Sequence, residues 1–158
     1  MLEPQKRISE RALTVWKITG VIFTVFPLLL VVGTVLFKIF FDWPIWIIVI
    51  SVLLLFLYIY TVIFLFPKMR WKRFRYDVRE QEIEIQQGIF IIKRTLIPMI
   101  RVQHVDTKQG PILRKYDLSS VTVSTAATTH EIPALQMEEA EELRLFISRL
   151  ARVADEDV

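Results

Sequence analysis

The sequence contains no cysteine, and this absence excludes several kinds of chemistry. Disulfide bonds, thiolate-bound metals and cysteine nucleophiles all need that side chain. Histidine is scarce as well. His104 and His130 lie on different predicted strands, and the acidic residues near them do not follow metal-ligand spacing. We therefore predict neither a metal site nor a bound cofactor.

Motifs typical of nucleotide-binding and hydrolytic enzymes are also missing. The sequence has no phosphate-binding loop, no dinucleotide-binding glycine pattern and no G-x-S-x-G turn. No serine has a recognisable base partner. We predict no catalytic residues and a protein that is not an enzyme. Nucleic acid is not an expected partner, because the main basic cluster adjoins an apolar segment and the predicted strands offer no stacking platform.

Acidic, basic and histidine side chains are absent from two long apolar segments, residues 18–37 and residues 45–66. A helix rises about 1.5 Å per residue, so roughly 20 residues cross a hydrocarbon core of about 30 Å. Residues 38–44 between the segments are too few to form a domain. We therefore predict a transmembrane hairpin of two helices. Without charged groups at membrane depth, it is a poor candidate for a transporter or a channel.

Positive charge flanks the hairpin on both sides and is scarce in its loop, where Lys38 is offset by Asp42. The flanking cations are Lys6, Arg7, Arg11 and Lys17 before the hairpin, and Lys68, Arg70, Lys72, Arg73 and Arg75 after it. Short segments rich in Lys and Arg stay in the cytoplasm. We therefore predict a multi-pass protein of the bacterial inner membrane with both termini cytoplasmic.

The second group of cations, Lys68, Arg70, Lys72, Arg73 and Arg75, is a candidate lipid-contact site, and we call it the basic collar. Cations near an anionic membrane surface contribute about 1 kcal/mol each. A flank that stops membrane transfer needs no specific ligand and has the same composition. We favour this second interpretation for specificity and expect nonspecific contact with the lipid bilayer.

Small and polar residues follow one side of each predicted span. Gly20, Thr24 and Pro27 fall at helical spacing on the first, and Ser51 and Tyr58 share a face of the second. Small residues allow helix backbones to approach closely. Our hypothesis is that these two faces pack together. The alternative is that the Gly20 face packs on another subunit.

After Trp71 the apolar residues alternate with period 2, which predicts half-buried strands. We expect six strands, with the third ended by Pro98 and the fourth followed by a turn at Gly110 and an irregular basic connector over residues 112–117. The expected strands cover residues 74–78, 82–87, 89–97, 102–109, 119–125 and 129–133. Apolar residues then recur at helical spacing over residues 140–151, after a glutamate-rich start and before several arginines, which suits the helix dipole.

These patterns divide the chain into five parts. We expect an amino-terminal arm over residues 1–17, the hairpin over residues 18–66 and the juxtamembrane collar segment over residues 67–72. A cytoplasmic α+β domain then covers residues 73–153, and a frayed tail covers residues 154–158. The apolar stripe of the last helix needs a surface to cover, and an open meander of strands provides one.

An ordered set of short motifs follows the hairpin. They are Trp71-Lys-Arg-Phe-Arg-Tyr76, Gln87-Gly88, Ile97-Pro98, Ile100-Arg-Val-Gln103, Gly110-Pro-Ile-Leu-Arg-Lys-Tyr116, Val121-Thr-Val-Ser-Thr125, Ile132-Pro-Ala-Leu135 and Glu139-Ala-Glu-Glu-Leu-Arg144. Together with the hairpin, this set resembles the bacterial PH-like membrane proteins of the YdbS-like family over nearly the whole chain.

The resemblance implies a PH-like bent antiparallel β-sandwich or barrel capped by a C-terminal helix. Such folds usually have seven strands, so a further strand is expected in residues 114–118 or from a division of residues 89–97. Asp117 stands where the family pattern has a glycine. Because Asp tolerates a left-handed backbone better than most residues, the turn is expected to survive. Inositol-lipid recognition is not expected, because the first hairpin loop, residues 79–82, is net acidic.

These observations favour a membrane-anchored, non-enzymatic PH-like module that assembles proteins at the cytoplasmic face. Exposed edges of a bent antiparallel sheet can accept another strand or chain. The resemblance implies that the partner is a second copy or a larger membrane protein with several PH-like domains, and that the assembly acts in envelope protection. The alternative is a membrane sensor that binds anionic lipid through the basic collar.

Overall fold

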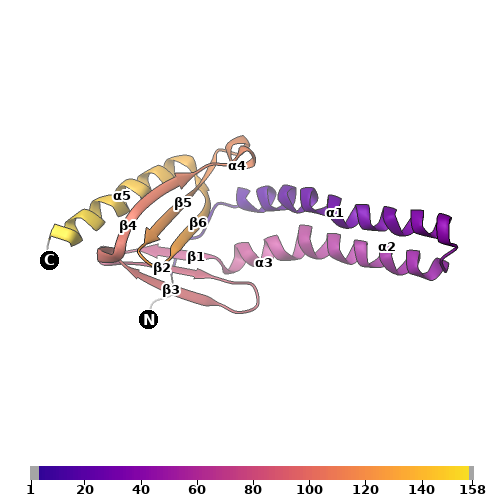
Figure 1. Ribbon diagram of the computed structural model, residues 1–158. Coiled ribbons are helices and arrows are strands. Elements are labelled where there is room, and N and C mark those ends of the chain that lie inside the picture. Colours follow the sequence, from indigo (N-terminus) through magenta and orange to yellow (C-terminus); the bar gives the residue numbers. More distant parts are fainter. Residues whose placement is uncertain (1–3, 157–158) are drawn as a thin grey trace. The chain divides into compact units, whose positions relative to one another are not determined.

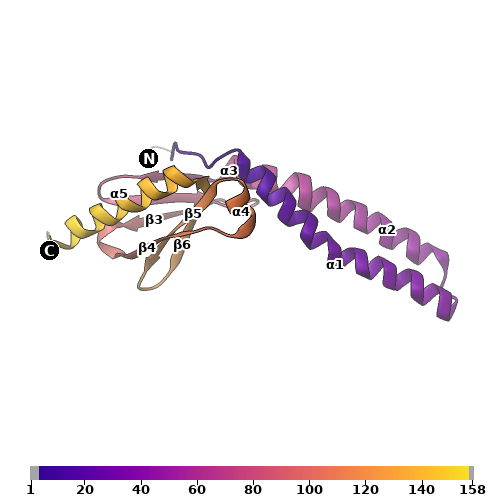
Figure 2. The same cartoon turned by 90° about the horizontal axis from the view of Figure 1, so that it is seen from above.

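The computed structural model describes residues 4–156, and these form two compact units (Figures 1 and 2). One unit is Trp16–Met69. The other combines the residues before Trp16 with those from Arg70 onward, so that it contains chain from both sides of the first unit. We call the first the hairpin unit and the second the PH-like unit.

The hairpin unit contains the two predicted spans. Helix α1 is Arg11–Phe41, and the second span joins α2 (Ile45–Ile59), the π-helix η1 (Tyr60–Leu65) and α3 (Phe66–Arg73). Both continuous helices are long and apolar enough to cross a membrane. Asp42 closes the connection with a left-handed backbone, φ 54°, and the Lys38 Nζ donates a 2.8 Å hydrogen bond to the Trp43 carbonyl.

The PH-like unit contains two antiparallel three-stranded sheets. The first, in the order β1-β2-β3, is built from Arg75–Val78, Glu82–Gln87 and Lys93–Pro98. The second, in the order β4-β5-β6, is built from Val102–Lys108, Leu118–Thr125 and Thr129–Gln136. The short helices η2 (Met99–Arg101) and α4 (Pro111–Lys115) lie between strands, and α5 (Met137–Glu156) closes the fold.

The core of the PH-like unit lies between the sheets and α5. Period-2 alternation buries Ile83 and Ile85 of β2, and the 3.6-residue period of α5 buries Leu143 and Ile147. Further buried side chains are Phe74, Tyr76, Ile97, Met99, Leu118, Val121, Val123, Ile132, Leu135 and Ala140. In Figure 1, α5 lies along the second sheet, and it contacts all three strands of that sheet. This arrangement confirms the expected bent antiparallel fold capped by a C-terminal helix.

Residues 6–15, which include the start of α1, are part of this core and are not a separate arm. Lys6 and Tyr76 exchange backbone hydrogen bonds of 3.2 and 3.1 Å, and the Ser9 amide donates to the Ala134 carbonyl at 3.3 Å. Ile8, Ala12 and Val15 are buried. Because these three recur at helix-like intervals, one apolar stripe of residues 8–15 completes the core. The domain boundary expected at residue 73 therefore has to include this earlier segment.

Several expected elements differ in the structure. The third strand begins at Lys93 and not at residue 89, because Gly88 at φ 132° starts a loop over residues 88–92. The irregular connector contains α4, since Pro111 occupies its first turn, where the missing N–H costs nothing. The sixth strand continues to Gln136, beyond the expected end at residue 133, because a bulge with Ala134 at φ 53° keeps the pairing beyond Pro133.

Two further expectations are confirmed, and those for a seventh strand and for the tail are not. Pro98 ends the third strand, and Asp117 has the left-handed φ of 53° that its turn requires. The described residues contain six strands, so neither proposed location supplies a seventh. The tail expected to fray from residue 154 is helical up to Glu156, and residues 157–158 lie outside the described chain.

Candidate functional site

The basic collar follows the end of the second span. Lys68, Arg70 and Lys72 are exposed on α3, whereas Arg73 and Arg75 are half-buried where the helix leads into β1. The helix continues through the collar because the Phe74 amide donates to the Arg70 carbonyl at 2.9 Å. The collar is thus a helical surface that presents three exposed cations and not an irregular linker.

Trp71 fixes the collar to the segment before α1. Its Nε1 donates a 3.3 Å hydrogen bond to the Ile8 carbonyl, and the Arg7 guanidinium lies 6.0 Å from its ring centroid. A cation over an indole face contributes about 0.5–1 kcal/mol at an exposed site. Both partners belong to the PH-like unit, so the collar from Arg70 onward is held by the folded domain.

Within the hairpin unit, Gly20 lies against the second span. A Cβ built on Gly20 would be 3.2 Å from the Val62 carbonyl oxygen and 3.3 Å from Val62 Cγ1. Further along, Thr34 Oγ1 and Ser51 Oγ are 3.2 Å apart. Each hydroxyl can donate its single proton either to a carbonyl of its own helix, that of Val31 or Ile48, or across the contact to the other hydroxyl.

The remaining packing candidates do not all meet one another. Thr24 donates from Oγ1 to the Gly20 carbonyl at 2.9 Å, within its own helix, and Pro27 is half-buried. Tyr58 is 36% exposed, and its carbonyl accepts a hydrogen bond from Thr61 Oγ1. Gly20 and Ser51 therefore contact the opposite helix, whereas Tyr58 is partly exposed.

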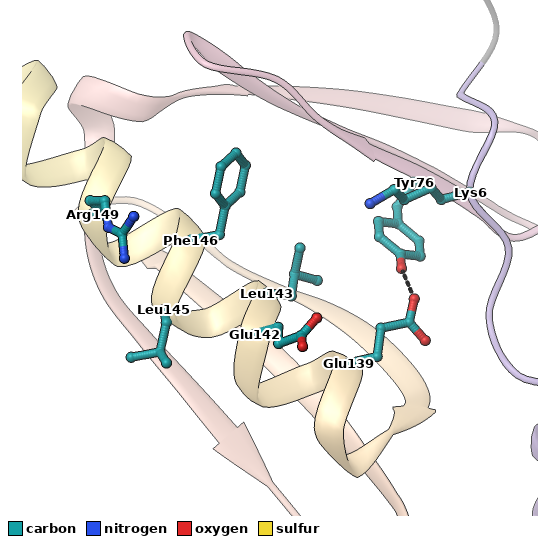
Figure 3. Close-up of a pocket in the computed structure, with 8 residues that line it drawn as sticks. All are labelled: Lys6, Tyr76, Glu139, Glu142, Leu143, Leu145, Phe146 and Arg149. Carbon is teal, nitrogen blue, oxygen red and sulfur yellow. Dashed lines mark hydrogen bonds between the residues drawn. The ribbon is translucent and has the colours of Figure 1, made fainter.

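A groove of about 470 Å³ runs between α5 and β1 in the PH-like unit. Figure 3 shows Tyr76 and Glu139 joined by a hydrogen bond at one end and Arg149 toward the other. Lys6 and Arg149 are balanced by Glu139 and Glu142, and the floor is formed by Leu143 and Phe146. Burial, followed by the bond to Glu139, raises the pKa of the Tyr76 phenol. These groups do not converge on a point, so the groove shows no preference for one charge.

A second groove, of about 630 Å³, lies beside β3. One wall is formed by β3 and η2, and the other by the turn between β5 and β6. Lys93, Arg101 and His130 line it without an acidic residue, and the His130 Nε2 is 2.9 Å from Thr128 Oγ1. The sheet order places β3 at the edge, so the groove runs beside a strand whose outer side pairs with no described strand.

The metal-ligating side chains of the described residues are dispersed. No group of three or more metal-ligating side chains comes together in residues 4–156. His104 and His130 lie on different strands of the second sheet and are not partners in its register. The arrangement can bind chains or surfaces through grooves, sheet edges and cations.

Comparison with known proteins identifies the family. The family model described as "Bacterial PH domain" matches residues 18–151, which include both spans and most of the folded domain. The chain belongs to the bacterial PH domain family. The family is defined by a domain and not by an enzymatic activity.

Two relatives of this bacterial PH domain protein come from Bacillus subtilis (strain 168). The UPF0699 transmembrane protein YdbS is 49% identical over 156 residues, which cover 99% of this chain and 98% of that protein. The UPF0699 transmembrane protein YdbT is 29% identical over 80 residues, which cover 48% of this chain and 16% of that protein. No solved structure matches the chain. The chain is thus a YdbS-like membrane protein, as the resemblance implied.

Sequence reasoning missed two features of this bacterial PH domain protein. Residues 89–92 are an apolar loop, exposed at residues 90–92, and not a strand, although Gly88 already marked a turn. Ile8, Ala12 and Val15 belong to the core, and their spacing of four and three residues was a signal that could have been found. The comparisons bear on neither feature, so the structure alone reveals them.

Proposed function

We propose that this protein is a non-enzymatic module that assembles membrane proteins at the cytoplasmic face, through the outer edge of β3. The partner is a second copy of the chain or a larger PH-domain membrane protein, and the assembly serves envelope protection. One observation carries the proposal: β3 is an edge strand beside a basic groove large enough to hold a further extended segment.

The hydrogen-bond pattern of the first sheet tells which β3 amides point away from β2. Met99 donates its amide hydrogen to the Gln81 carbonyl at 2.9 Å, and the register continues as Glu82 opposite Pro98 and Ile83 opposite Ile97. In an antiparallel pair, successive residues point their amides alternately toward and away from the neighbouring strand. The amides of Arg94 and Leu96 therefore point away from β2.

The amino-terminal segment of the same chain already hydrogen-bonds to β1, the other edge of the first sheet, and to β6 of the second sheet. Lys6 pairs with Tyr76 on β1, and the Ser9 amide bonds to Ala134 on β6. Edge strands that are left open tend to pair with other chains, and proteins usually cover them. Lys6 covers part of β1, whereas β3 is an edge strand beside a groove. This difference supports β3 as the docking edge.

The size of the second relative supports a larger partner. Its 80 matched residues make up 48% of this chain but only 16% of YdbT, so YdbT is the longer protein. YdbS and YdbT both have the family name UPF0699 and come from one organism. A partner that contains a domain of the same kind would offer strands of matching length to β3.

The charge distribution supports the cytoplasmic side as the place of assembly. Residues 4–15 and the residues from Arg70 onward fold as one unit, which supports a topology with both ends of the hairpin on the same side of the bilayer. Lys and Arg concentrate at those ends, and Asp42 offsets Lys38 in the opposite loop. By the positive-inside rule, the folded domain faces the cytoplasm.

The decisive experiment removes one outward amide of β3 without changing its pairing to β2. The Leu96→Pro variant of the full-length chain lacks that donor, and proline is tolerated at edge positions whose amide faces outward. Leu96→Ala keeps the amide and loses the same exposed side chain, so it is the matched control. Both variants and the wild type are recovered by affinity tag in mild detergent and analysed by size and mass spectrometry.

We expect the wild type and Leu96→Ala to be recovered as a complex with a second copy or with a larger PH-domain protein, and Leu96→Pro to be recovered alone. Circular dichroism must show that Leu96→Pro remains folded. Recovery of the wild type as a monomer alone would contradict the proposal. Equal recovery of partner by Leu96→Pro and Leu96→Ala would exclude β3 as the edge that binds it.

The exposure of Lys68, Arg70 and Lys72 on α3 favours a second candidate function, an anionic-lipid sensor. Its test is the lipid retained by the full chain during purification from membranes, measured by mass spectrometry. A sensor would retain one head group even at high salt, whereas purely electrostatic contact would be lost as screening increases. The triple variant Lys68→Gln, Arg70→Gln and Lys72→Gln should abolish any such preference.

A further inference from the structure

The loop between β2 and β3 carries the most exposed apolar side chains of the PH-like unit. Phe90 is 78% exposed and Ile91 is 84% exposed, and Ile92 beside them is also exposed. Three consecutive large apolar residues at one tip make a patch that a water-facing loop rarely has. Contiguous exposed apolar surface of this kind marks a site that another surface covers.

The loop is held in this shape by its first residue. Gly88 has φ 132°, a conformation that side chains rarely adopt, and a Cβ there would lie 1.9 Å from the Ile91 carbonyl oxygen. Gln87 and Lys93 are the last paired residues on either side of the loop. The apolar tip is therefore a tight projection from a hairpin with a fixed backbone.

The register of the first sheet places this tip at the end where the chain enters from the membrane. Arg75, the first residue of β1, is opposite Gln86, and Gln87 is next to the loop. The helix that continues the second span ends at Arg73, two residues before Arg75. The pairing of Arg75 with Gln86 therefore places the start of the loop next to the point where this helix passes into β1. Figure 1 shows the loop and the start of β1 at the same end of the sheet.

The charges of the sheet are divided between its two ends. Lys93 and Arg94 follow the loop, and residues 86–94 contain no acid. Lys72 and Arg73 precede β1, and Arg75 is its first residue. At the other end, Arg79 forms ion pairs with Asp77, Glu82 and Glu84, at 3.2, 3.1 and 3.6 Å. The loop end is thus cationic with an apolar tip, which complements a bilayer surface of anionic lipid.

We propose that the loop over residues 89–92 inserts into the bilayer leaflet that faces the domain. Phe90 and Ile91 enter the boundary between head groups and acyl chains, and Lys93 and Arg94 contact the phosphates of anionic lipids. The occupant of this patch is lipid and not protein, because the chain that carries the loop is itself attached to the membrane by its second span. The proposal does not depend on the assembly role of β3.

The absence of cysteine allows a direct test with single labels on the full-length chain. Ile91→Cys carries an environment-sensitive fluorophore at the tip. Ile100→Cys carries it at a site that is 52% exposed beyond the opposite end of β3. Both residues are exposed, so the variants retain their core contacts. The proteins are placed in nanodiscs of phosphatidylglycerol and phosphatidylcholine, where both faces are accessible to a soluble quencher.

We expect the label at position 91 to be quenched by nitroxide-bearing lipid and to be severalfold less accessible to iodide than the label at position 100. Removing phosphatidylglycerol, or introducing Lys93→Gln, should reduce the lipid quenching. Equal iodide access at the two sites would overturn the proposal. So would a label at position 91 that is shielded from iodide but unaffected by lipid nitroxide, because a second protein chain would then cover the loop. Lipid quenching that is unchanged by both phosphatidylglycerol removal and Lys93→Gln would overturn the role of the cations.

Discussion

The phenol of Tyr76 donates a 2.9 Å hydrogen bond to Oε1 of Glu139 and thereby joins β1 to the first turn of α5. The ring of Tyr76 is fully buried, and its backbone pairs with Lys6. One residue thus connects the amino-terminal segment, the first sheet and the closing helix. Its substitution and its ionisation are the most informative probes of the domain.

Replacing Tyr76 by Phe should lower the free energy of unfolding by about 1 kcal/mol near neutral pH, the net value of a typical intramolecular hydrogen bond. The ring remains buried, so the core packing is kept. Urea unfolding of the detergent-solubilised protein, followed by circular dichroism, measures the change. Glu139→Gln keeps an acceptor at the same position and should cost less than Tyr76→Phe. The reverse order would contradict the assigned bond.

Alkaline pH should destabilise the wild type more than Tyr76→Phe. Burial raises the pKa of this phenol above its ordinary value, so the folded state retains the proton that the unfolded state releases above about pH 10. Below that pH the phenol contributes fully to the free energy of unfolding. As the pH rises above it, this contribution falls by about 1.4 kcal/mol per pH unit. Unfolding free energies measured from pH 8 to pH 12 should show this difference in slope. Parallel curves for the two proteins would refute it.

Substitution of glycine by alanine should have opposite effects at the two glycines of α1. At Gly20 a new Cβ would lie 3.2 Å from the Val62 carbonyl, whereas at Gly33 it meets no atom within 4 Å. Gly33→Ala should be neutral or stabilising, because alanine favours helix by about 1 kcal/mol. Gly20→Ala should be destabilising by about 1–3 kcal/mol from overpacking. Thermal unfolding in detergent compares them. Equal effects would show that the helices do not approach at Gly20.

Gly20→Leu with Thr24→Leu separates contact within one chain from contact between chains. The double variant should have a lower thermal stability as a monomer, because Gly20 faces Val62 of its own chain. A variant that keeps its monomer stability but loses self-association on gel filtration would place the Gly20 face against another subunit.

Truncating Ile8 should destabilise the PH-like unit although it lies before the first span. Ile8 is 3% exposed, and removing a buried isoleucine side chain costs about 2–5 kcal/mol. Ile100→Ala, at a 52% exposed position, is the control and should stay within about 0.5 kcal/mol of the wild type. Limited proteolysis of the domain in detergent should detect the difference. Equal resistance of Ile8→Ala and the wild type would contradict its place in the core.

The sequence predicted those parts of the fold in which local pattern and tertiary contact agree. Val121 and Val123 alternate as expected for a buried strand and are fully buried in β5. The apolar residues of α5 recur at helical spacing, and Ala140 and Ile147 are buried as the stripe required. In α5 one face meets the core, so the period alone identifies the helix. In β5 the polar residues Ser120 and Thr122 are buried as well, so the alternation identifies the strand but not the burial of its second face.

Prediction was wrong where a positive-φ residue or a contact with a distant segment determines the structure. Ile91 and Ile92 have strong strand propensity, yet they lie in a loop because Gly88 reverses the chain before them. Ala134 adopts φ 53° at a bulge, which extends β6 beyond the proline that was expected to end it. The open edge of β3 is a property of sheet order, which depends on contacts between segments far apart in sequence.

The placement of residues on both sides of the hairpin within one core has a consequence for biosynthesis. The Trp71 indole bonds to the Ile8 carbonyl across 63 residues, and the intervening chain is almost entirely the two spans. Contacts between distant segments form late, because the chain between them must first be placed. The amino-terminal stripe of Ile8, Ala12 and Val15 therefore reaches its partners from Arg70 onward only after the whole hairpin has been synthesised. A chain that stops within the hairpin leaves this stripe without the core that buries it.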